Sequence, residues 1–165
     1  MNISKFTQNS IQAVDRCEKL AYEYGNQEIE QEHLLYSLLT IEDSLILKLI
    51  EKMEIQKEYF VNRVKQALEK RVKVQGGQIY IGQYLNKVLV SAEDEAKQMG
   101  DEYVSVEHLF LMMIKEPNKE IKEIFREFGT FNESGFRFRE PSSLYTPFSS
   151  STIFSYKRTS ADTAV

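Results

Sequence analysis

The chain has 165 residues, of which 42% are hydrophobic and 28% charged, and its formal net charge is −4 with a pI of about 5.4. This composition is ordinary for a globular domain, and the length suffices for an apolar core without disulfides or metal. The acidic balance argues against a nucleic-acid-binding protein, which needs a basic surface to displace counterions from phosphates. We therefore expect one domain, or one domain with a tail, and no nucleic-acid partner.

The cysteine content and the apolar runs limit the compartment and the chemistry. Cys17 is the single cysteine, so neither an internal disulfide nor a paired-thiolate metal site can form. The first residues lack the apolar stretch of a secretory signal, and the apolar run 109–114 is far shorter than the ~20 residues that span a bilayer. The sequence thus predicts a soluble cytoplasmic protein with no membrane partner.

Apolar residues recur at helical spacing in seven segments, which predicts an all-α fold. Gly25, Gly100 and Gly129 stand where three of these patterns stop, as glycine often does after the last turn of a helix. The predicted helices cover about 7–24, 31–39, 57–71, 83–99 and 118–128, with one more beginning after Asp43 and another at Ser105.

The sequence contains an internal repeat. The residues after Gly25 resemble those after Gly100, 75 positions later, and the same offset pairs apolar with apolar residues through three helices, such as Cys17 with Ala92 and Ile46 with Ile121. Self-similarity over this length predicts a duplicated structural unit. We expect two pseudo-twofold repeats of a four-helix unit, a first unit at about 5–71 and a second unit at about 80–129, that share one core.

The offset also predicts an eighth helix at 132–146, and the residues there contradict it. Gly135 costs about 1 kcal/mol in a helix interior and Pro141 about 3 kcal/mol. We therefore expect this helix to be missing or poorly formed. Ser and Thr are frequent from residue 141 on, which is typical of disorder, so residues 130–165 are predicted to form a divergent, disordered tail.

Two Glu-His pairs, Glu32-His33 and Glu107-His108, are the most conspicuous polar feature. If the units face each other, two imidazoles and two carboxylates would suit a metal ion. The alternative is structural, with each histidine at a helix start and each glutamate in the first turn, where the helix dipole favours a carboxylate. Adjacent side chains point to different sides of a helix, which favours the structural interpretation.

Catalytic motifs are absent from the sequence. Cys17 lies on the apolar face of the first helix, where a buried and inert thiol is the norm. The chain has no G-x-x-x-x-G-K-[ST] phosphate loop and no G-x-S-x-G, H-E-x-x-H or C-x-x-C. We expect no ATPase or other enzyme activity in this chain, and neither a cofactor nor a bound metal.

Five short motifs together are typical of one family: Lys5-Phe6-Thr7, Ala21 to Gln27, Glu32 to Leu35, Gly76-Gly77-Gln78 and Gly100 to Leu109. Over about residues 1–129 they resemble the Clp N-terminal domain, also called the Clp repeat domain. Gln31 and Val106 stand just ahead of the two Glu-His pairs, where the unfoldases ClpA and ClpC tend to have threonine, so the resemblance is greatest to the ClpB disaggregases.

The resemblance implies a module that binds unfolded or aggregated protein and is joined to AAA+ ATPase modules. It implies client contact through a polar cluster, Thr7, Asp101 and Glu107, beside apolar walls to which Phe6 and Leu85 are assigned. Each polar residue also has a structural alternative as a cap, turn or first-turn residue. The second functional hypothesis is an adaptor-docking domain of a Clp protease unfoldase, with adaptor proteins as partners.

The sequence departs from the family beyond residue 129. The AAA+ modules are absent, and the residues from Thr130 on do not resemble the family's continuation. A truncated or frame-shifted disaggregase and a stand-alone relative both remain open at this point. In either case we expect binding of clients and not their ATP-driven unfolding.

Overall fold

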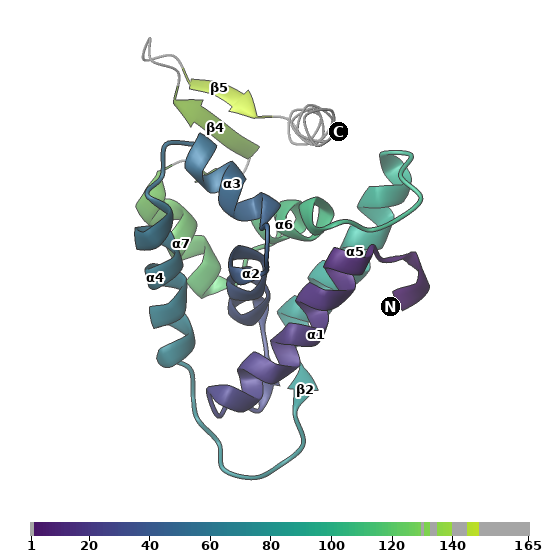
Figure 1. Ribbon diagram of the computed structural model, residues 1–165, viewed down its shortest axis with the longest axis vertical. Helices are drawn as coiled ribbons and strands as arrows, with labels where there is room; N and C mark the ends of the chain where they lie inside the picture. Colours follow the sequence, from purple (N-terminus) through teal and green to yellow (C-terminus); the bar gives the residue numbers. More distant parts are fainter. Residues whose placement is uncertain (1, 130, 133–134, 140–144, 149–165) are drawn as a thin grey trace.

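The computed structural model describes residues 2–129, 131–132, 135–139 and 145–148 (Figure 1). All seven predicted helices are present, close to their predicted bounds, and the described helices include none long and apolar enough to cross a membrane. In chain order the elements are η1 (Ile3–Lys5), α1 (Gln8–Glu23), β1 (Glu28–Ile29), α2 (Gln31–Thr40), α3 (Leu45–Lys52), α4 (Lys57–Glu69), β2 (Tyr80–Ile81), α5 (Gln83–Gln98), α6 (Val106–Lys115), α7 (Lys119–Phe128), β3 (Phe131–Asn132), β4 (Gly135–Arg139) and β5 (Tyr145–Phe148).

Helix α2 is the centre of the core. The other α-helices of the described chain all pack against it, and it lies in the middle of the bundle in Figure 1. Leu34, Leu35 and Leu38 are fully buried there. Complete burial of a leucine side chain contributes about 1.5–3 kcal/mol, so this helix organises the domain.

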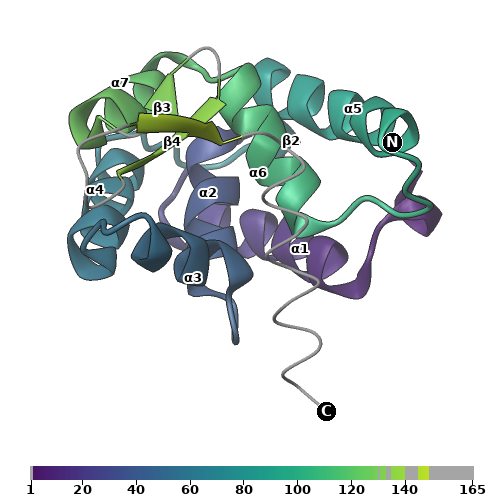
Figure 2. The same ribbon diagram turned by 90° about the horizontal axis from the view of Figure 1, so that it is seen from above.

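Helix α6 is also buried on all sides, as its uninterrupted apolar sequence predicts. Each residue from Val106 to Ile114 is buried, including Glu107 and His108. Figures 1 and 2 show α6 lying between α5 and α7. The helices α2 and α6 therefore occupy corresponding places in the two units, and their bounds are offset by 75 residues.

Short parallel backbone pairings connect the two units. Strand β1 pairs with β2, and Phe6 pairs with Val104 in an isolated bridge. The Gly82 amide donates to the Ile29 carbonyl at 2.7 Å. By the 75-residue offset, Gly82 corresponds to Thr7 and Ile29 to Val104, and the Thr7 amide donates to the Val104 carbonyl at 2.9 Å. The segment that precedes each unit's first helix is thus held by the other unit.

The chain beyond α7 differs from what the repeat and the composition predict. Where a copy of α4 would lie, the described residues form strands and not a helix, and β3, β4 and β5 pair as an antiparallel sheet. These described residues are therefore paired in strands, in contrast to the predicted disorder. Aromatic and basic residues alternate along 136–139, which is the period of a strand. Gly135 and Pro141, on either side, are unfavourable in a helix. The remainder of 130–165 lies outside the described residues.

Candidate functional site

A pocket opens where the N-terminal ends of three helices, α1, α3 and α6, converge. Its volume is about 370 Å³. Asp43 is exposed at this pocket, whereas Glu107 is only 1% exposed. The first amide groups of a helix lack partners within the helix, so such ends attract carbonyl and carboxylate oxygens. The lining residues are Thr7, Gln8, Asn9, Asp43, Leu45, Ser105, Val106 and Glu107.

Local capping interactions hold two of these helix ends together. The Thr7 hydroxyl accepts from the Ser10 amide at 3.3 Å and so caps α1. The Ser10 hydroxyl donates to the Val104 carbonyl at 2.8 Å, next to the bond from the Thr7 amide to the same carbonyl. Ser105, the following residue, is the N-cap of α6. The start of α1 is therefore fixed against the start of α6.

The structure brings two of the five expected site residues into this pocket, Thr7 and Glu107. Asp101 lies in the turn after α5 and is not part of the lining, but its carboxylate contacts His108 Nε2 at 3.1 Å. Phe6 and Leu85 are 5% and 2% exposed. Both side chains are packed in the core and neither lines this pocket, so their part in client contact stays a prediction.

Asp43 is a pocket residue to which the sequence pattern assigned no functional role. It lies ahead of the N-cap of α3, in a left-handed backbone conformation with φ of 52°. The 75-residue offset of the repeat could have identified Asp43. Position 43 precedes Asn118 by 75 residues, and Asn118 binds Glu32, the first-unit equivalent of Glu107.

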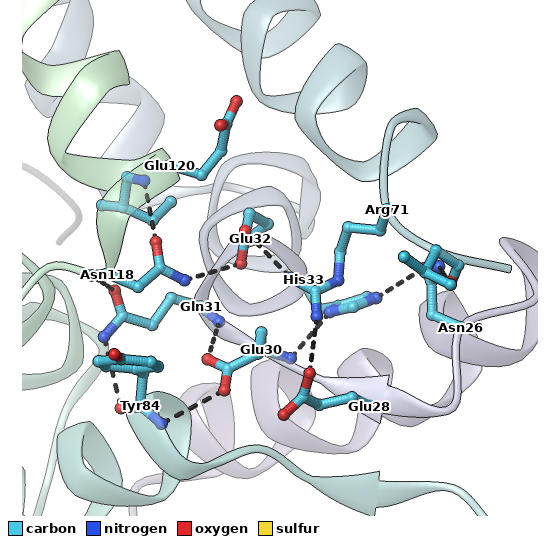
Figure 3. A network of polar contacts seen from close by, with 12 residues as sticks. Asn26, Glu28, Glu30, Gln31, Glu32, His33, Arg71, Tyr84, Asn118 and Glu120 are labelled. Atoms are coloured by element: carbon cyan, nitrogen blue, oxygen red, sulfur yellow. Dashed lines mark hydrogen bonds and ion pairs between the residues drawn. The ribbon is translucent and has the colours of Figure 1, made fainter.

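The equivalent place in the first unit is filled by the chain's own side chains (Figure 3). Glu32 is buried, and its two carboxylate oxygens accept from Arg71 Nη1 at 3.1 Å and from Asn118 Nδ2 at 3.0 Å. Arg71 also binds Glu28 at 3.2 Å. The Glu32 carboxylate therefore receives one hydrogen bond from a guanidinium and one from a side-chain amide.

The same polar network ties the two units together through α2. Gln31 is fully buried; its amide nitrogen donates to the carbonyls of Glu116 and Tyr84, and its amide oxygen accepts from the Asn118 amide at 2.8 Å. Glu30 accepts from the Tyr84 amide at 3.3 Å, and burial raises the pKa of this carboxyl. Figure 3 shows these side chains bridging α2 to α5 and α7.

Both histidines of the Glu-His pairs close capping boxes. His33 Nδ1 accepts from the Glu30 amide at 3.0 Å, and His108 Nδ1 accepts from the Ser105 amide at 2.9 Å. The second nitrogen of His33 therefore carries the proton and donates to Asn26 Oδ1 at 3.0 Å. Burial, aided by nearby Arg71, lowers the pKa of His33 to about 4.

This geometry supports the structural interpretation of the Glu-His pairs. The described residues include no group of three or more histidine, cysteine or acidic side chains suited to a metal ion. Cys17 is buried; its thiol donates to the Ala13 carbonyl at 3.2 Å, and burial raises the pKa of the thiol far above its usual range. A neutral thiol in the core is a poor nucleophile.

Comparison with known proteins identifies the family. The family model of the Clp repeat N-terminal domain matches residues 5–128. The chaperone protein ClpB of Nitratidesulfovibrio vulgaris is 40% identical over 139 residues, which are 81% of this chain and 16% of that protein. ClpB of Porphyromonas gingivalis is 37% identical over 114 residues, 69% of this chain and 13% of that protein. The chain thus spans a small part of the length of these relatives.

Solved structures share the fold. The Hsp104 N-terminal domain of Candida albicans superposes with a TM-score of 0.68 at 23% identity, covering 92% of this chain and 87% of that one. The ClpV N-domain, solved in complex with a VipB peptide, gives a TM-score of 0.64 at 19% identity, with 79% and 81% covered. Since the family model covers both units and the helices superpose on known N-domains, the chain belongs to the Clp repeat N-terminal domain family.

Proposed function

We propose that this chain is a polypeptide-binding N-terminal module of the ClpB disaggregase type, which holds exposed segments of unfolded or aggregated proteins. The observation that carries the proposal is the pocket at the starts of α1, α3 and α6, where Glu107 and Asp43 lie beside the cap residues Thr7 and Ser105. Amide groups at the helix ends suit a client's carbonyl oxygens, and the two carboxylates suit its amides and basic side chains. Recognition of this kind demands no particular sequence.

Comparison with the first unit supports a basic side chain as one occupant. Glu32 binds the Arg71 guanidinium there, and Glu107 is the residue 75 positions later. Glu107 is buried, and it lines a pocket of about 370 Å³. An arginine or lysine of a client that enters this pocket would bind Glu107 as Arg71 binds Glu32.

A titration of the isotopically labelled full chain with an unstructured casein-like protein tests this proposal. We expect amide resonances of Thr7, Asp43 and Glu107 to shift, and Glu107→Gln with Asp43→Asn to weaken binding severalfold, since two charge-assisted contacts are lost. The control is Glu42→Gln, which removes one charge from the adjacent exposed residue outside this pocket.

Three outcomes would count against the proposal. Unchanged resonances around the pocket at high micromolar client would show that unfolded polypeptide does not bind there. Binding of one folded partner with a fixed stoichiometry, and not of casein, would favour the adaptor-docking alternative. Equal weakening by Glu42→Gln and by the pocket variants would indicate a general charge effect.

A further inference from the structure

A second and larger groove lies on another part of the surface, between the start of α5, the end of α6 and α7. Its volume is about 730 Å³. It shares no lining residue with the pocket at Thr7 and Glu107. Its lining combines an apolar floor with a basic rim: Gln83, Tyr84, Lys87, Ile114, Lys115, Glu116, Pro117, Lys122, Phe125 and Arg126.

The rim carries four cations, although the chain as a whole is acidic. Lys87, Lys115, Lys122 and Arg126 line the groove with a single carboxylate, Glu116, in a chain of net charge −4. Lys115 contacts Glu95 at 2.8 Å, and Lys87 contacts Glu116 at 3.5 Å. Both lysine side chains are exposed, and surface pairs of this kind are worth about 0–1 kcal/mol each, so an incoming carboxylate can compete for the lysines.

The floor and one wall of the groove are apolar. Ile114 and Phe125 are buried beneath it, and Pro117 lies in the connection between α6 and α7. Tyr84 is 52% exposed and forms an aromatic side of the groove. An exposed tyrosine at a groove is a common anchor for a partner, because its ring gives a large contact area at small entropic cost.

We propose that this groove binds an acidic, amphipathic segment of a partner protein, with apolar side chains over Ile114 and Phe125 and carboxylates toward the basic rim. Charge complementarity selects this occupant, since the rim attracts negative charge and the floor excludes a purely polar ligand. Nucleic acid fits less well, because phosphate binding gains little from an apolar floor. The inference is independent of the proposed function at the Thr7–Glu107 pocket, which attracts basic side chains.

Fluorescence polarisation of the full chain with two labelled peptides tests this. One peptide of about 16 residues places Leu and Glu on opposite faces of a helix, and the second has the same residues in scrambled order. We expect the amphipathic peptide to bind at least about fivefold more tightly than the scrambled one, and Arg126→Glu to weaken it about fivefold. Tyr84→Ser, which alters the wall without touching the core, should weaken it similarly.

Matched controls separate the groove from general electrostatics. Lys119→Glu makes the same charge change on another exposed position of α7, outside the groove lining, and should change affinity less than twofold. Glu107→Gln should leave peptide binding unchanged, which keeps this inference separate from the pocket at the start of α6. Equal binding of both peptides, or equal losses for Lys119→Glu and Arg126→Glu, would overturn the proposal. Binding of single-stranded nucleic acid more tightly than the amphipathic peptide would overturn it as well.

Discussion

The two units of this domain share their helix positions and differ in their polar partners. Helices α1 and α2 recur 75 residues later as α5 and α6 with the same lengths, and both units begin their second helix with a histidine capping box. Yet His33 contacts the neutral amide of Asn26, whereas His108 contacts the carboxylate of Asp101. Apolar positions set the common scaffold, and polar positions have diverged within it.

The paired glutamates also differ between the two units. In the first unit Arg71, which follows α4, occupies the place beside Glu32. In the second unit Glu107 lines a surface pocket, and no described helix corresponds to α4. Glu32 is therefore bound by a cation of its own unit, whereas Glu107, itself buried, lines a pocket.

The largest expected effect comes from emptying the first-unit site. Arg71→Met leaves the buried Glu32 with the Asn118 amide but without its cation, so we expect a loss of about 3 to 4 kcal/mol in the free energy of unfolding. Urea denaturation measures it. Lys70→Met, the same change at the adjacent exposed lysine, should cost less than about 0.5 kcal/mol. Losses of similar size in both variants would contradict the internal role of Arg71.

A second effect concerns the pH dependence of stability. The pKa of His33 is about 4 in the folded chain and 6.5 in the unfolded one, so the unfolded state binds the proton more readily. Its contribution is complete above pH 6.5 and falls by about 2 to 3 kcal/mol as the pH drops to 4. Denaturant unfolding across this range measures the loss.

Asn26→Asp serves as the matched variant for this pH experiment, because it copies the Asp101–His108 contact into the first unit. A carboxylate beside the ring stabilises imidazolium and raises the pKa of His33, so stability should fall less steeply below pH 6.5. Since other groups titrate in both proteins, the difference between the two curves is the readout. Parallel curves would show that His33 does not cause the loss.

The smallest expected effect tests how the two caps have diverged. Gly82, the equivalent of Thr7, has no side chain because a Cβ there would overlap the Glu30 carboxylate. Gly82→Thr should therefore destabilise the protein by about 2 kcal/mol through overpacking. Adding Glu30→Ser recreates the Thr7–Ser105 combination and should restore about 1 kcal/mol. Additive losses in the double variant, measured by thermal unfolding, would refute this coupling.

Much of the fold could be predicted from the sequence because its apolar spacing is clear. The seven helices, the burial of α6 and the stops at Gly25, Gly100 and Gly129 all follow from periodicity and local backbone preference. The strands after α7 were not predicted, since Gly135 and Pro141 count against a helix without indicating what replaces it. Pairing partners are set by distant contacts, not by local preference.

The candidate site was less predictable than the fold. Thr7 and Glu107 were expected to act together and share a pocket, whereas Phe6 and Leu85 are buried and Asp43 had no predicted role. An apolar residue near a helix start has the same local pattern whether it lines a groove or fills the core. Exposure depends on which helix covers it, and this is a property of the assembled bundle.

The sequence by itself determined the duplicated helical scaffold, the family and the absence of a phosphate loop from this chain, because each depends on residue type and spacing. Only the tertiary structure decided which side chains surround each of the two glutamates. Glu32 and Glu107 follow the same local pattern, yet Glu32 binds Arg71, which lies 39 positions further along the chain. Such a partner is chosen by three-dimensional packing, which brings together residues that local sequence preference cannot pair.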